Sequence, residues 1–112
     1  MPATLDDLLA IDGVTVAFES AADGKCVDYK GKDVTPEMAA LFTRYCALVT
    51  MSFSILAGAF TALSEENWVP QKLWTYTGGD YTVVVGGYRG VFIETVKANL
   101  NELHNVLSGG IP

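Results

Sequence analysis

The chain has 112 residues, half of them apolar, with 13 acidic and 7 basic side chains and a net charge of −6. This size and composition predict one packed domain over residues 1–112 and are unlike those of a disordered chain. The Lys and Arg residues are scattered, so they form no basic stripe that could neutralise the phosphates of a nucleic acid.

The first predicted elements are a short helix and a β-hairpin. Thr4 suits the N-cap of the helix, and acidic side chains follow it where the helix dipole is positive. Residues 14–19 alternate between apolar and polar side chains, which is typical of a half-buried strand, and residues 25–30 give a second strand. The Asp23-Gly24 pair between them favours a tight turn, because glycine adopts a positive φ without steric cost.

A long helix, three strands and a last helix complete the chain. Thr35 and Pro36 suit the start of a helix over 35–65, and strands are predicted at about 71–77, 81–85 and 90–94. The last helix, about 95–108, has an apolar stripe and ends at a glycine pair: Val96, Leu100, Leu103, Leu107, Gly109 and Gly110. The order α-β-β-α-β-β-β-α predicts an α+β fold with one five-stranded antiparallel sheet, covered by helices on one or both faces.

The long helix has two faces that differ in side-chain size. One carries large apolar residues and is predicted to cover the sheet: Met38, Leu41, Phe42, Tyr45, Val49, Leu56, Phe60 and Leu63. The opposite face is small, mildly polar and uncharged, so another backbone can approach it closely. This face predicts a homodimer interface formed by Ala40, Thr43, Ala47, Thr50, Met51, Ser54 and Gly58.

Arg44 is the only charged residue between Met38 and Leu63, and this length nearly matches a membrane span of about 20 residues. Three observations oppose that interpretation: Ser and Thr recur along the helix, no basic cluster flanks it, and the sheet would lose its cover. No signal-peptide pattern opens the chain. We therefore expect a cytoplasmic protein without a membrane partner, in which Cys26 and Cys46 stay reduced and unbridged.

We find no pattern of catalytic, cofactor-binding or metal-binding residues. His104 is the only histidine, so any triad would have to include it, and we interpret it as a helix-surface residue. Gly86, Gly87 and Gly90 lead into a strand, whereas a phosphate loop leads into a helix N-terminus. The sequence therefore predicts a protein that is not an enzyme and takes no cofactor.

Four aromatic residues surround the middle hairpin: Trp68, Trp74, Tyr76 and Tyr81. Such residues on a sheet are usually core or cross-strand pairs, but at a sheet edge they form a partner surface. The sequence leaves both interpretations open.

Several motifs resemble a known family. The opening Thr4-Leu-Asp-Asp-Leu-Leu9, then Asp12-Gly-Val14 and Ala22-Asp-Gly24, are similar to the start of roadblock/dynein-light-chain proteins, which have a profilin-like architecture. Gly24-Lys-Cys-Val-Asp-Tyr-Lys-Gly31 and Gly78-Gly-Asp-Tyr81 resemble a set of small bacterial roadblock-like proteins classed as a domain of unknown function. The resemblance covers essentially the whole chain, and for the wider family it implies dimeric scaffolds and regulators of small GTPases.

The function predicted from the sequence is a homodimeric, non-enzymatic interaction module that scaffolds or regulates another protein, with a small Ras-like GTPase as a candidate partner. The alternative is a small-ligand sensor, because profilin-like sheets can hold ligands between sheet and helix. A cavity between sheet and helix would favour the sensor, and a broad partner surface would favour the module.

Overall fold

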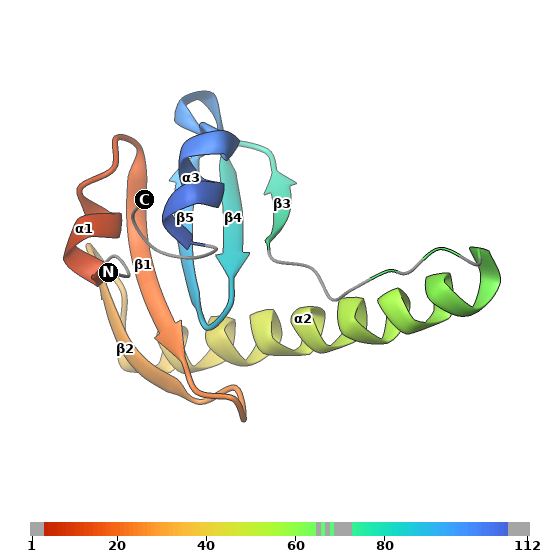
Figure 1. Ribbon diagram of the computed structural model, residues 1–112. Helices are drawn as coiled ribbons and strands as arrows, with labels where there is room; N and C mark the ends of the chain where they lie inside the picture. Colours follow the sequence, from red (N-terminus) through yellow and green to blue (C-terminus); the bar gives the residue numbers. More distant parts are fainter. Residues whose placement is uncertain (1–3, 65, 67, 69–72, 108–112) are drawn as a thin grey trace.

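The protein forms one five-stranded antiparallel sheet with the spatial order β2-β1-β5-β4-β3 (Figure 1), seen in a computed structural model that describes residues 4–64, 66, 68 and 73–107. The predicted fold class is confirmed. The elements are α1 (Leu5–Leu9), β1 (Val14–Ser20), β2 (Cys26–Gly31), α2 (Pro36–Ser64), β3 (Trp74–Gly78), β4 (Tyr81–Gly86), β5 (Arg89–Glu94), a 3₁₀ turn η1 (Thr95–Lys97) and α3 (Leu100–Leu107).

The helix starts are fixed by the residues that the sequence indicates. Thr4 and Asp7 form a capping box: Asp7 N–H donates to Thr4 Oγ1 at 3.1 Å, and Thr4 N–H donates to an Asp7 carboxylate oxygen at 2.9 Å. These two hydrogen bonds with Thr4 lower the pKa of the Asp7 carboxyl. At the start of α2, Thr35 Oγ1 accepts the Met38 N–H at 3.2 Å, so the predicted N-cap is confirmed.

Helices cover both faces of the sheet. On one face, α1 and α3 pack on alternate strand residues, with Leu8, Ala17, Val91, Ile93 and Leu103 all fully buried. The side chains between them point to the other face, where α2 lies. There the Phe18, Phe42 and Phe92 rings form a cluster with centroids 5.0–6.0 Å apart. Three aromatic rings therefore join α2 to the neighbouring strands β1 and β5.

The last helix differs from its prediction. Residues 95–97 form a 3₁₀ turn, and α3 begins only after Asn99, whose side chain accepts the Glu102 N–H at 3.1 Å. Val96 was predicted to lie on the apolar stripe but is 92% exposed, because the break rotates it away from the core. Three predicted positions lie outside the described residues: the end of the long helix at 65, the strand start at 71, and the helix end at 108–110.

The long helix is unbroken over 29 residues, as predicted, but it turns a different stripe to the sheet. Its buried residues are Ala39, Thr43 and Ala57. Of the residues predicted to cover the sheet, Phe42 packs against it and Val49 is half-buried. The others are exposed: Met38, Leu41, Tyr45, Leu56, Phe60 and Leu63. The sheet supplies the bulk instead, through large aromatic side chains, and small helix residues let the backbones come close. A Cβ at Gly24 would stand 3.2 Å from the Ala47 Cβ.

Candidate interaction surface

The most exposed apolar feature of the protomer is α2 itself, which continues past the β3 edge of the sheet (Figure 1). Ile55 is 70% exposed and Leu63 82% exposed. Beside Gly58, a Cβ would meet no atom within 4 Å. A helix that is apolar on all sides is normally buried, but the residues that the structure describes leave the projecting part of α2 uncovered.

The total surface area agrees with an uncovered face. The protomer exposes 7159 Å², whereas a folded monomer of 12.0 kDa exposes about 6000 Å². The excess of about 1200 Å² is larger than the roughly 800 Å² that each partner contributes to a standard protein interface. The exposed area is therefore large enough to include one uncovered interface.

An apolar groove of about 400 Å³ lies between α2 and strand β3. Tyr45, Val49 and Phe53 form its helix side, and Trp74 and Tyr76 form its strand side. Trp74 is held in place by its Nε1–H, which donates to Thr50 Oγ1 at 2.8 Å, and by the Phe53 ring at 6.2 Å. The groove continues the exposed helix surface onto the sheet edge.

Three of the four aromatic residues that the sequence offered as a partner surface gather at this edge. The strand alternation places Trp74, Tyr76 and Tyr81 on the face of the sheet that α2 covers, and Tyr76 and Tyr81 are exposed. Trp68 lies apart from them, near the end of α2, where its ring packs 5.1 Å from that of Phe60. The structure therefore separates Trp68 from the other three.

The two edge strands of the sheet differ in how well they are protected. On β2, the pairing with β1 is interrupted by a bulge at Glu19/Ser20, and the Asp28 carboxylate accepts the Tyr29 N–H at 2.8 Å. Bulges and edge charges prevent a further strand from pairing. Strand β3 contains no charged residue. It is the edge that a further strand can join.

The register of β3 shows which backbone groups point outward. Gly78 pairs with Tyr81 across the two-residue turn Gly79-Asp80, and the closing pair of such a hairpin exchanges both hydrogen bonds. Hydrogen-bonded and non-hydrogen-bonded pairs alternate along an antiparallel ladder, so Tyr76 is again hydrogen-bonded to β4. Thr75 lies in a non-hydrogen-bonded pair, and its N–H and C=O therefore point to the free edge.

A line of hydroxyl groups fixes β3 to the rest of the sheet. Thr77 Oγ1 lies 2.9 Å from Thr82 Oγ1, which lies 3.0 Å from Thr95 Oγ1, and Thr95 donates to the Gly79 carbonyl at 2.9 Å. These bonds hold the edge strand in position, so the outward groups of Thr75 are arranged in advance for pairing.

The predicted dimer-interface residues occupy two environments. Thr43 is fully buried against its own sheet, which corrects its assignment, and Ala47 and Thr50 are half-buried there. The other four residues are exposed: Ala40, Met51, Ser54 and Gly58. The residues predicted for the dimer interface are thus divided between the contact of α2 with the sheet and its exposed surface.

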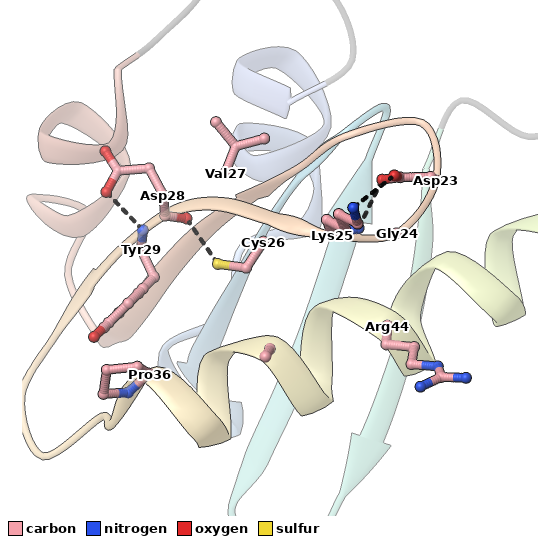
Figure 2. A pocket seen from close by; sticks show the side chains of 10 residues that line it. Asp23, Gly24, Lys25, Cys26, Val27, Asp28, Tyr29, Pro36 and Arg44 are labelled. Carbon is pink, nitrogen blue, oxygen red and sulfur yellow. Dashed lines mark hydrogen bonds and ion pairs between the residues drawn. The ribbon is translucent and has the colours of Figure 1, made fainter.

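A second groove, of about 720 Å³, lies between β2 and the first half of α2 (Figure 2). Asp23, Lys25, Asp28 and Arg44 line it with charges of both signs. Lys25 Nζ lies 3.9 Å from the Asp23 carboxylate, and the Arg44 side chain extends away from the strand. The groove is a mixed polar surface and contains no cluster of like charge for an ionic ligand.

Both thiols are free, in line with the sequence prediction. Burial raises the pKa of Cys46 to about 11, and burial followed by the Asp28 charge raises the pKa of Cys26. Only the thiolate is nucleophilic, so a raised pKa means less reactive thiolate at neutral pH.

We therefore expect iodoacetamide to modify Cys26 before Cys46 in the native protein. The rate at Cys46 should rise about tenfold per pH unit until its pKa is approached. Intact mass and peptide mapping over a pH series measure both rates, and unfolded protein is the control in which both cysteines react alike. Faster reaction of native Cys46 at neutral pH would contradict the burial of its thiol.

Among the described residues, α2 is a helix long and apolar enough to cross a membrane, with a mean hydropathy of 1.9 over a window of which 11% is buried. Length and composition alone are weak evidence for a span. Within the same part of the chain, no group of three or more His, Cys, Asp or Glu residues is placed to hold a metal ion.

The architecture, with one long helix and two short ones on a five-stranded sheet, defines a roadblock-type fold. Myxococcus xanthus MglB superposes with a TM-score of 0.70 at 11% identity, over 90% of this chain and 85% of that one. The gliding protein MglB from Thermus thermophilus gives 0.69 at 14% identity, over 90% and 76%. A Roadblock/LC7 domain from Streptomyces avermitilis gives 0.67 at 13%, over 88% and 79%.

The chain belongs to the family described as "Uncharacterized conserved protein (DUF2173)", whose model matches residues 4–109. No curated protein matches the sequence. The resemblance to roadblock proteins that the motifs indicated is confirmed for the fold.

Proposed function

We propose that this protein is a homodimeric interaction module without catalytic activity. The observation that carries the proposal is the projection of an apolar α2 beside an unprotected β3 edge. In a two-fold dimer, β3 pairs antiparallel with the β3 of the second copy. The projecting half of each α2 then lies over the other protomer, in the groove lined by Tyr45, Phe53 and Tyr76. A self-complementary contact of this kind closes on itself.

A protein cover explains the surface of α2 better than a lipid cover does. The outward N–H and C=O groups of β3 can pair with a strand of another protein, whereas the interior of a bilayer offers them no hydrogen-bond partner. The net charge of −6 and the absence of a basic cluster beside α2 in the sequence also disfavour an anionic membrane surface. We therefore keep the expectation of a cytoplasmic protein.

The dimer then acts by binding another protein, with a small Ras-like GTPase as the candidate that the roadblock resemblance implies. A module of this kind regulates by positioning the switch loops of its partner and needs no catalytic side chain of its own. Because the chain is acidic, its partner should present a basic patch, and exposed charge pairs are screened by salt.

The test is binding to the Ras-like GTPases of the source cell, each purified and loaded with GDP or a GTP analogue. We expect one GTPase to bind in a nucleotide-dependent way, with an affinity that falls as salt rises, and nucleotide hydrolysis or exchange to change in the complex. Absence of binding to every such GTPase, with only metabolites retained in the β2–α2 groove, would support the ligand-sensor alternative and contradict the proposal.

A further inference from the structure

A small pocket of about 170 Å³ lies between α2, the β1–β2 turn and the β4–β5 turn. Figure 1 shows the β4–β5 turn next to α2. The pocket differs from the two grooves described above, because neither β2 nor β3 contributes a described residue to its lining. It is a space at the boundary between helix and sheet, inside one protomer.

The pocket exists because small residues meet around it. Cys46 and Ala47 form part of its helix side, Ala21 and Ala22 come from the β1–β2 turn, and Gly87 comes from the β4–β5 turn. Side chains of this size leave a space that larger ones would fill. A well-packed interior contains few such spaces, so this one is a candidate binding site.

Hydrogen bonds and close packing hold the walls of the pocket in place. The Ser20 N–H donates to the Tyr88 carbonyl at 2.7 Å, which joins the end of β1 to the β4–β5 turn. The Gly24 N–H donates to the Ala21 carbonyl at 2.9 Å. Gly24 itself packs on α2, where its Cβ would stand 3.2 Å from that of Ala47. The site is therefore formed before a ligand arrives, as ligand pockets usually are.

The lining favours an uncharged occupant. None of the described residues that line the pocket carries a charge at neutral pH, since burial raises the pKa of the Cys46 thiol to about 11. The Ser20 hydroxyl donates to the Tyr88 carbonyl at 3.4 Å, and the Thr50 hydroxyl accepts the Trp74 Nε1–H at 2.8 Å. An ion in the pocket would lose its hydration without gaining a countercharge.

The lining also favours an aromatic occupant. Its floor is the Phe18 ring, which is 1% exposed, together with the buried Val85 side chain. Tyr88 adds a second aromatic side chain, and Met51 and Cys46 add two sulfur atoms from α2. Ring edges and faces pack well against other rings, and sulfur makes favourable contacts with them.

We infer that this pocket binds a small uncharged aromatic molecule with a single ring. The size agrees, because an apolar cavity of about 150 Å³ stays dry and accepts benzene. The inference goes beyond the proposed function, to which it adds a ligand site. It does not depend on that function, because every wall of the pocket belongs to one protomer.

The test is a titration of the nitrogen-15-labelled protein with toluene, followed through the amide chemical shifts. We expect the largest changes at residues 46–51 and 85–88, with a dissociation constant on the order of 0.1 mM. Benzoate, which has the same ring and a negative charge, should bind at least about tenfold more weakly.

Two substitutions on opposite walls fill the pocket: Ala47→Leu and Ala21→Leu. Each should weaken toluene binding at least about tenfold, because the added side chain occupies the space of the ring. Ala40→Leu is the matched control, since Ala40 is exposed on the same helix and lines the β2–α2 groove instead. It should leave the affinity unchanged. Thermal unfolding shows which variants are folded, and Ala21→Leu decides the matter if Ala47→Leu is not.

Three results would overturn the inference. The first is the absence of shift changes up to the solubility limit of toluene. The second is a set of changes centred on Tyr76 and Val83, which would place toluene in the groove between α2 and β3. The third is an unchanged affinity in a folded pocket-filling variant. Sedimentation of the same protein without toluene reports on the proposed dimer, so the two failures are distinguishable.

Discussion

Thr75→Pro is expected to separate the proposed dimer into monomers. The Thr75 N–H points to the free edge of β3, so proline there removes an outward donor and leaves the bonds between β3 and β4 intact. Two such bonds are lost in a two-fold dimer, each contributing about 1 kcal/mol, and the dissociation constant should rise about 30-fold or more.

The measurement is sedimentation equilibrium of the variant over a concentration series. Thr75→Val is the matched control, since it keeps the backbone N–H and the β-branched shape and removes only the hydroxyl. We expect the control to remain dimeric. A Thr75→Pro variant as dimeric as the control, with unchanged circular dichroism, would exclude strand pairing at β3.

Gly90→Val should cause a large loss of stability. A Cβ at residue 90 would overlap the ring of Phe18, which packs with Phe42 and Phe92 under α2. Overpacking of this kind lowers the free energy of unfolding by about 3 kcal/mol. Gly58→Ala should have the opposite sign and stabilise α2 by about 1 kcal/mol.

Urea unfolding of both variants, monitored by circular dichroism, measures the expected loss and the expected gain of stability in one experiment. The experiment compares two glycines that differ in what surrounds them: Gly90 is buried in the sheet, whereas Gly58 faces open space. A Gly90→Val variant as stable as the wild type would mean that the Phe18 ring does not lie against residue 90.

Most of the fold could be predicted from local signals. Thr35-Pro36 marked the start of α2, the Asp23-Gly24 and Gly79-Asp80 turns set the hairpins, and the order of elements set the sheet class. The last helix was predicted less well, because the apolar spacing of Val96 with Leu100 is also compatible with a 3₁₀ turn followed by a new N-cap at Asn99.

The orientation of α2 could not be predicted from side-chain size. A sheet that carries Phe18, Phe92 and Trp74 leaves room mainly for small helix residues. Most of the large apolar stripe therefore faces outward, although Phe42 packs against the Phe18 and Phe92 rings. The pattern on the helix alone does not show whether the helix or the sheet supplies the large side chains of their contact.

The edge properties of the sheet needed the strand order. Trp74, Tyr76 and Tyr81 could be grouped from their positions in one hairpin, but only the order β2-β1-β5-β4-β3 places that hairpin at an edge. The outward direction of the Thr75 N–H depends on the register between β3 and β4. Only the two-residue turn Gly79-Asp80 sets that register locally.

The mass of the native protein in solution tests the central proposal, self-association, most directly. The protomer has a mass of 12.0 kDa, and sedimentation equilibrium at micromolar concentration should give a species of at least two protomers, in which the apolar surface of α2 is covered. A single species of 12.0 kDa under the same conditions would contradict the account.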